Sequence, residues 1–414
     1  MNTLRWLMLA VCLTLNSFGQ AAHQPAFDVE KATRAYLDRM PPDKKAKSDA
    51  YFEGGYWLQL WGFLYAAGTA LLFLQGRFSA RMRDLAERCT RFKPLQTALY
   101  AAQYFVLTAI LTLPLDIYSG FFREHQYGMS NQDLGGWFGD WGKGLIVGVI
   151  GGALLLMALF GVVRRLPRSW HIWGAVVTLG FFIIGALIAP VFIAPLFNKY
   201  TVLEDPKVVE PILRLARANG IPADKVYEMD ASKQTKRVSA NVSGFLGTTR
   251  ITLNDNLINR STLPEIEAVM GHEMGHYVMN HVFKEILFFG IVIVVGFALL
   301  RWTIDRALSV FGQRWGINGI GDVAVVPLAI LVFNAYFFVL TPFTNSYTRM
   351  QEMEADMFGL NTARQPDGFA EAALKLGEYR KMEPGPIEEW IFFDHPSGAT
   401  RIRCAMRWKA ANLP

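Results

Sequence analysis

The sequence predicts an all-α multi-pass membrane protein with six to seven transmembrane helices and a small mixed α/β domain. Three observations lead to this fold class. Of the 414 residues, 52% are hydrophobic and the mean hydropathy is +0.21, which is too apolar for an ordinary soluble domain. Several long runs without charge could each cross the roughly 30 Å hydrocarbon core as a helix. Charged stretches between and after these runs carry shorter helix and strand patterns.

The uncharged runs define the spans in chain order. A shorter run, 286–300, is expected to span by continuing the helix before it. At the N terminus, Arg5 precedes an apolar run and then small residues, a pattern that fits either a cleaved signal or a seventh span. Five runs are long enough to span by themselves: 54–76, 94–115, 144–163, 169–198 and 323–348.

These runs divide the chain into five parts. Residues 1–22 are the signal-like or first transmembrane segment, 23–198 the transmembrane region, 199–283 a first soluble part, 284–348 a transmembrane helix pair and 349–414 a C-terminal soluble part.

The first soluble part shows alternating elements. Residues 206–219 read as a helix ended by Gly220, and Val226–Met229 as a short strand. Strands at 238–246 and 250–253 flank Gly247-Thr248-Thr249, which is a hairpin signal.

The charge balance excludes one class of partner. The net charge of +6 and the pI near 9.1 are explained by basic loops that face the cytoplasm. The sequence contains no aromatic-basic RNA motif and no zinc finger, so we expect no nucleic-acid partner. Cys12, Cys89 and Cys404 follow no zinc or disulfide spacing, so sulfur is not expected as a metal ligand.

The most informative motif is His272-Glu273-Met274-Gly275-His276, an H-E-x-x-H pentapeptide. Thr262-Leu263-Pro264-Glu265 begins a helix with a capping box ahead of it. Four residues are just over one helical turn, so both histidines face one metal ion and Glu273 projects toward the water that the metal activates. The alternative is a helix with two ordinary histidines.

A catalytic zinc site needs a third protein ligand. Glu352 and Asp356 are four residues apart and share one face of a predicted helix, whereas Glu354 points elsewhere. One carboxylate could bind the metal, and the other could accept a hydrogen bond from a ligating histidine. The alternative is a solvated acidic helix.

With these motifs the chain resembles the membrane-integral CAAX prenyl protease family over nearly its whole length. The sequence HEMGHYVMNH at 272–281 is similar to the family's HELGHWKLGH, and the family's R-x-x-E-x-x-A-D pattern recurs at 349–356. A histidine-proline pair with an arginine six residues after the histidine recurs at 395–401. Residues 236–241, 250–253 and 118–134 resemble further family segments, whereas Asn241-Val242-Ser243 departs from the family's asparagine, alanine and aromatic.

The resemblance implies a zinc metalloendopeptidase with one Zn²⁺ per chain. It makes Glu352 the third ligand beside His272 and His276. Asp356 is then the carboxylate that accepts a hydrogen bond from a ligating histidine. Glu273 is then the general base. The resemblance also implies spans around a large water-filled chamber and a peptide or protein substrate, prenylated in the family.

Four more residues take roles from the mechanism and the resemblance. His395, with Arg401 nearby, would donate to the oxyanion. The strand that contains Asn241 would pair with the substrate, and Asn241 and Arg401 are the expected substrate-binding residues. His281 lies five residues past His276, off the ligand face, and is expected to be structural.

Two alternative functions and a conflict over the membrane orientation remain open. A general membrane quality-control metalloprotease would carry the same zinc motifs, and a non-enzymatic membrane scaffold could carry a vestigial site. Alternate loops are basic, including the expected connection between the last two spans with Arg301, Arg306 and Arg314. This pattern predicts that the zinc site faces the periplasm of a bacterial inner membrane. By resemblance, family members present the site to the cytosol. The sequence leaves the physiological substrate and the oligomeric state open.

Overall fold

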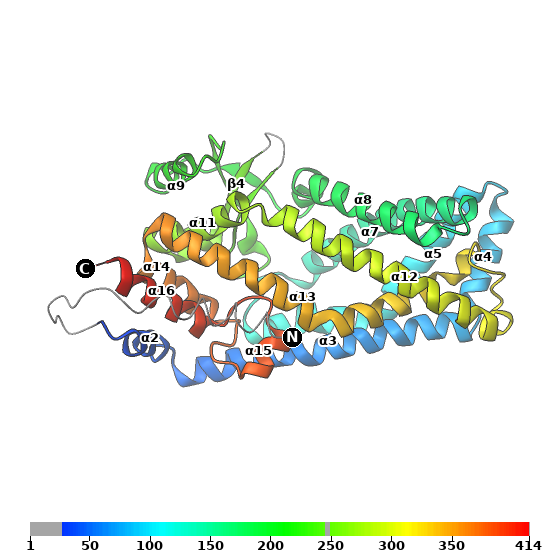
Figure 1. The fold of residues 1–414 in the computed structure, drawn as a ribbon, viewed down its shortest axis with the longest axis horizontal. Helices are drawn as coiled ribbons and strands as arrows, with labels where there is room; N and C mark the ends of the chain where they lie inside the picture. Colours follow the sequence, from blue (N-terminus) through cyan, green and yellow to red (C-terminus); the bar gives the residue numbers. More distant parts are fainter. Residues whose placement is uncertain (1–26, 245–248, 414) are drawn as a thin grey trace, which may run out of the picture.

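The computed structural model describes residues 27–244 and 249–413, which form an elongated helical body with a small sheet near one end (Figure 1). The predicted fold class is confirmed. The segment 1–22, expected to be a signal or a first span, lies outside the described residues. Among the described residues, six helical segments are long and apolar enough to cross a membrane: Pro42–Gln75, Lys93–Tyr127, Leu134–Arg165, Trp170–Leu196, His281–Trp315 and Val323–Ala363.

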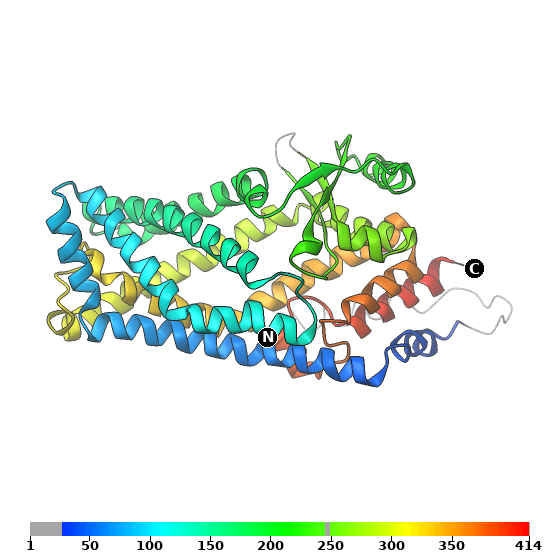
Figure 2. The ribbon, with the colours of Figure 1, turned by 180° about the vertical axis from the view of Figure 1, so that it is seen from behind.

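The first four spans run back and forth along the long axis of the molecule (Figure 2). They begin with α3 (Pro42–Gln75), which leads away from the sheet to α4 (Phe78–Cys89) at the far end (Figure 1). The chain returns through α5 (Lys93–Ile117), which η1 (Tyr118–Phe122) and α6 (Arg123–Tyr127) extend. It then crosses through α7 (Leu134–Arg165) and back through α8 (Trp170–Ile188), which η2 (Ala189–Ile193) and η3 (Ala194–Leu196) extend.

The last two spans are α12 (His281–Trp315) and α13 (Val326–Ala363). The prediction that 286–300 continues the preceding helix is wrong. The preceding helix, α11 (Leu263–Val278), ends before a new helix starts at His281, and Asn280 between them has a left-handed backbone with φ of 57°. The expected loop arginines Arg301, Arg306 and Arg314 lie inside α12, because this helix of 35 residues, about 52 Å long, extends beyond the hydrocarbon core.

A four-stranded sheet lies beside α11. Its order is β1-β2-β4-β3, with β2 and β4 parallel and the outer pairs antiparallel. The predicted strand at 226–229 and the predicted antiparallel pairing of the next two strands are confirmed, although β3 is shorter than predicted and residues 245–248 lie outside the described part. The first strand was not predicted. The strands are β1 (Tyr200–Val202), β2 (Val226–Met229), β3 (Ala240–Ser243) and β4 (Arg250–Asn254).

The pattern of side chains on α11 explains its position. Ile266, Met270 and Met274 recur every four residues, and all three are buried against the sheet and α9 (Pro206–Ala218). The predicted capping box of Thr262 and Glu265 begins the helix. The face that carries the two histidines of the motif is therefore directed away from the sheet core.

The C-terminal part packs against the other side of α11. A second apolar core, which includes Ile402, Met406 and Trp408, joins these helices to the N-terminal helix α2. The elements are α2 (Val29–Leu37), α14 (Pro366–Leu376), α15 (Pro386–Phe392) and α16 (Gly398–Asn412); a short helix, α10 (Asp255–Arg260), precedes α11.

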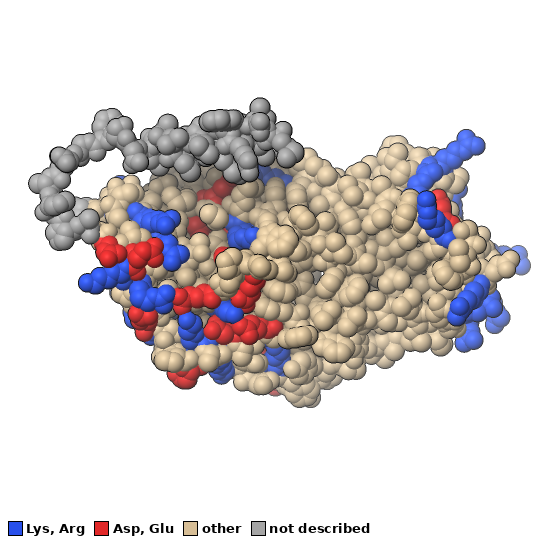
Figure 3. Space-filling model, turned by 60° about the horizontal axis from the view of Figure 1, so that its bottom comes forward, with Lys and Arg blue, Asp and Glu red and all other residues tan. Residues whose placement is uncertain are grey.

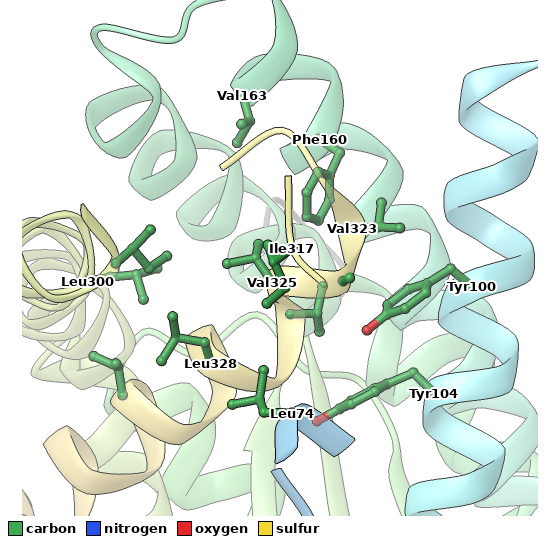
Figure 4. Close-up of a cluster of buried hydrophobic side chains, with 14 of the residues drawn as sticks. Leu74, Tyr100, Tyr104, Phe160, Val163, Leu300, Ile317, Val323, Val325 and Leu328 are labelled. Carbon is green, nitrogen blue, oxygen red and sulfur yellow. The ribbon is translucent and has the colours of Figure 1, made fainter. Parts of the chain in front are cut away.

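The spans hold together through a third core at the end far from the sheet. Side chains from α3, α5, α7, α12 and the start of α13 meet there, among them Leu74, Tyr100, Phe160, Leu300 and Leu328 (Figure 4). On the face drawn in Figure 3, charged side chains gather at the two ends of the molecule, and the middle is a broad band of uncharged residues. This is the surface expected of a protein that crosses a bilayer.

Candidate metal centre

The candidate site forms where α11 and α13 approach each other closely. Small residues make this possible: a Cβ atom added to Gly359 of α13 would lie 2.7 Å from the backbone nitrogen of His272 on α11. Cβ atoms on Gly271 and Gly275 of α11 would likewise come within 3.1 Å of the backbone of α13. The near contact of the two backbones lets the short acidic side chains of α13 reach the histidines of α11.

Three of the predicted residues come together at this contact. Nε2 of His272 lies 3.1 Å from Nε2 of His276, and each of these nitrogens lies 3.3 Å from an oxygen of Glu352. A tetrahedral site with bonds near 2.1 Å needs donors about 3.4 Å apart, so the three side chains have the spacing of a zinc site. Two imidazoles and one carboxylate also form a donor set typical of catalytic zinc.

The surroundings of these donors favour a cation. Oε2 of Glu352 is buried and, within the described part of the chain, lacks a hydrogen-bond partner. Burial opposes a charge on His272, but the hydrogen bond to Asp356 and the nearby carboxylate of Glu352 outweigh burial and raise the pKa of its imidazole to about 10. A buried carboxylate oxygen without a hydrogen bond is costly, and a bound metal ion would satisfy it. The residues present therefore fit a divalent metal.

Asp356 and Arg401 lie directly behind His272. Oδ1 of Asp356 is 2.8 Å from Nδ1 of His272. This contact directs Nε2, the other ring nitrogen of His272, toward Glu352. Arg401 donates from Nε to Oδ2 of Asp356 over 3.0 Å and from its terminal nitrogen to Oδ1. Both groups are buried. Since the guanidinium contacts are directed at Asp356, the expected role of Arg401 at the substrate stays a prediction.

Glu273 lies on the open side of the site, in a cleft that also exposes His272 and His395. Burial raises the pKa of its carboxyl group, as suits a group that exchanges protons near neutral pH. The edge strand β3, which contains the exposed Asn241, lies along this cleft through Ala240. Apolar side chains form much of the remaining wall: Val238, Leu257, Val269, Phe369, Leu376 and Tyr379.

His395 approaches the site from the loop after α15. Its Nε2 lies 3.3 Å from Oε2 of Glu352, and its Nδ1 lies 2.7 Å from Oδ1 of Asp394. Arg349 holds this loop against α13 by donating to the carbonyl oxygens of Glu389 and Phe393. Sequence reasoning did not identify Asp394 as the partner of His395, although its position next to the histidine was the available signal.

A second unanticipated contact involves His281. Its Nδ1 lies 2.9 Å from Nδ1 of His276, and its Nε2 lies 3.1 Å from Oε2 of Glu354. Five residues along a single helix would put His281 off the ligand face, but the chain turns at Asn280 and brings the ring back. Glu354 does not belong to the donor cluster formed by the described residues.

The fold and this site together define an integral membrane metallopeptidase. Residues 203–409 match Peptidase family M48, and residues 28–199 match a family described as CAAX prenyl protease N-terminal, five membrane helices. The chain belongs to the M48 peptidase family, in its CAAX prenyl protease branch, and is a metalloendopeptidase. The alternative of a non-enzymatic scaffold is thereby set aside.

Individual relatives agree with this assignment. The chain is 33% identical to CAAX prenyl protease 1 of Saccharomyces cerevisiae over 312 residues, which cover 72% of this chain and 69% of that protein. It is 29% identical to an uncharacterized metalloprotease, YhfN, of Bacillus subtilis over 360 residues, which cover 85% and 84%. The crystal structure of S. mikatae Ste24p superposes with a TM-score of 0.76 at 23% identity and covers 91% of this chain and 94% of that one.

Proposed function

We propose that this protein is a zinc-dependent endopeptidase that cleaves near the C terminus of membrane-associated peptides. One observation carries the proposal: the donor triangle of His272, His276 and Glu352 lies beside Glu273 in a cleft bordered by an edge strand. His272, His276 and Glu352 would hold one zinc ion per chain. When bound, the metal supplies a Lewis acid that lowers the pKa of water and polarises a carbonyl group.

The chain's own residues manage the protons. Glu273 takes a proton from the attacking water as general base and delivers it to the leaving amine as general acid. His395 donates from Nε2 to the negative charge that develops on the carbonyl oxygen. Asp394 supports this role, because its carboxylate oxygen lies 2.7 Å from Nδ1 and orients the ring. Asp356, held by Arg401, keeps His272 in the tautomer that ligates through Nε2.

The substrate backbone would add to the sheet at β3. This strand is the outermost one on its side, and Asn241 is exposed on it. An extended peptide paired with β3 would run past His272 and Glu273, because Ala240 and these two residues line the same cleft. The apolar wall of the cleft suits the hydrophobic side chains of a CAAX-type C terminus.

Cleavage of a farnesylated CAAX peptide by the purified protein, with and without a chelator, tests the proposal. We expect release of the C-terminal tripeptide, its loss with chelator and its return with added zinc. The same peptide without the farnesyl group measures how far the lipid matters. Cleavage that persists in chelator would overturn the zinc assignment. No cleavage of either peptide by zinc-loaded protein would overturn the CAAX-type specificity.

We also propose that the site faces the periplasm of a bacterial inner membrane. The connections at the end far from the site carry the basic excess, with Arg77, Arg81, Arg88 and Arg91 around α4 and Arg165 and Arg168 before α8. The positive-inside rule puts that end in the cytoplasm.

The chain contains a natural probe for this orientation, because Cys89 is exposed at the basic end. A cysteine added at the C terminus would report on the other end, once Cys12 and Cys404 are replaced by alanine. An impermeant maleimide should label only the added cysteine on intact cells. Labelling of Cys89 alone would reverse the orientation.

A further inference from the structure

We propose that His281, supported by Glu354, is a positioning residue that fixes the metal-binding tautomer of His276. The inference rests on the proposed metal site and adds a role for two residues outside the donor set. His281 is 2% exposed, and its ring meets that of His276 at 75° with the centroids 4.9 Å apart. This contact is polar, since the two Nδ1 atoms are 2.9 Å apart.

The backbone places His281 there. Helix α11 ends at Val278, and α12 starts at His281 after Asn280 adopts the left-handed conformation that asparagine tolerates better than most residues. Along one continuous helix a residue five positions after His276 would lie on a different face. The turn at Asn280 instead returns His281 to the outer edge of the His276 ring.

The proton arrangement then follows from hydrogen-bond chemistry. A His276 that ligates through Nε2 carries its proton on Nδ1, so Nδ1 of His281 must be the acceptor. The proton of a neutral His281 is consequently on Nε2, where Oε2 of Glu354 lies 3.1 Å away and accepts it. Glu354 is held in turn by Nζ of Lys284 over 2.7 Å. The hydrogen bonds thus form one relay, in which His276 donates to His281 and His281 donates to Glu354.

The two ligating histidines therefore have unequal support. His272 contacts the buried carboxylate of Asp356 directly, and two nitrogens of Arg401 hold that carboxylate. His276 contacts a neutral imidazole, and the carboxylate behind it has a side chain that is 36% exposed. We expect the loss of this relay to weaken the metal less than the loss of Asp356 does, because solvent can partly replace an exposed carboxylate.

The relay also links three elements. His281 and Lys284 begin the span α12, Glu354 lies on α13, and His276 lies on α11. The membrane helices α12 and α13 thus help to position one metal ligand, His276. A packing role alone would not require the two Nδ1 atoms to approach within hydrogen-bond distance.

The test compares two replacements of His281, one of which offers a hydrogen-bond acceptor and one of which does not. Asparagine can place its amide oxygen where Nδ1 accepts, whereas leucine fills the space without an acceptor. The measurement is the rate of zinc release to a chromophoric chelator from purified protein in detergent. Thermal unfolding of each metal-free variant shows whether the fold is retained. His281→Leu should release zinc about 10- to 100-fold faster than wild type, and His281→Asn only a few-fold faster.

Three further variants complete the experiment. Glu354→Gln should speed zinc release by a few-fold, whereas Glu378→Gln, which removes another partly exposed ion pair, with Arg260, should leave it unchanged. His276→Ala separates the two proposals: if it still binds zinc normally, the metal site itself is wrong. If His276→Ala loses zinc while His281→Leu and His281→Asn release it at the same rate and both remain folded, the relay is refuted and His281 only packs.

Discussion

Gly359 is the residue whose replacement most directly tests the close approach of α11 and α13. A Cβ atom at this position would lie 2.7 Å from the backbone nitrogen of His272 and 3.1 Å from its Cα, where ordinary contacts begin at 3.4 Å. The obstructing atoms are backbone, so no side chain can rotate away. The helix that carries His272 must instead move by several tenths of an ångström.

The magnitude of the Gly359→Ala effect follows from two opposing terms. Alanine is intrinsically better than glycine in a helix by about 1 kcal/mol. Overpacking of a tight contact costs about 1–3 kcal/mol, so the net change in stability is a loss of at most about 2 kcal/mol. Metal ligands tolerate errors of only about 0.2 Å, so the zinc affinity should fall by at least about 10-fold, or 1.4 kcal/mol.

The assay for this variant is chelator competition for zinc, combined with thermal unfolding in detergent. Gly161→Ala is the matched control, because a Cβ at Gly161 on α7 meets no atom within 4 Å. The control should be as stable as wild type or more so, with an unchanged zinc affinity. A Gly359→Ala protein that binds zinc as tightly as wild type would refute the argument that backbone contact builds the site.

Four further substitutions separate the roles around the metal. Glu352→Ala should lower zinc occupancy strongly, whereas Glu354→Ala should keep the metal bound in excess zinc; metal analysis of both decides which carboxylate is the ligand, and the reverse result would exchange them. Asp356→Asn should weaken zinc affinity or activity by about 10- to 100-fold, because the amide supports His272 less well, and an unchanged chelator titration and turnover would contradict this. His395→Ala should retain zinc but lose about 100-fold in turnover, as for other lost oxyanion donors. Loss of metal in that variant would instead make His395 a ligand.

Much of the site could be predicted because its spacing is local. Four residues separate His272 from His276 and Glu352 from Asp356, and in each case a helix turns that interval into a shared face. The association of the two helices was inferred from chemistry, since a catalytic zinc needs a third ligand. The uncharged runs likewise predicted the spans, because the bilayer imposes their length.

The features that could not be predicted depend on breaks between helices and on tertiary contacts. A left-handed residue at Asn280 ends the helical register, so a helical argument could not predict that His281 contacts His276. The close approach at Gly359 depends on the position of α11, which comes from a distant part of the sequence. Strand β1 is only three residues long and is defined by its pairing with β2, so it gave no periodic signal.

The central claim is that His272, His276 and Glu352 hold a zinc ion for which Glu273 acts as base. The most direct test is Glu273→Gln, measured for zinc content and for peptide hydrolysis in the same preparation. The account predicts about one zinc per chain, as in wild type, and no detectable hydrolysis, because the amide cannot take the proton. Normal turnover by the zinc-loaded variant would contradict the account.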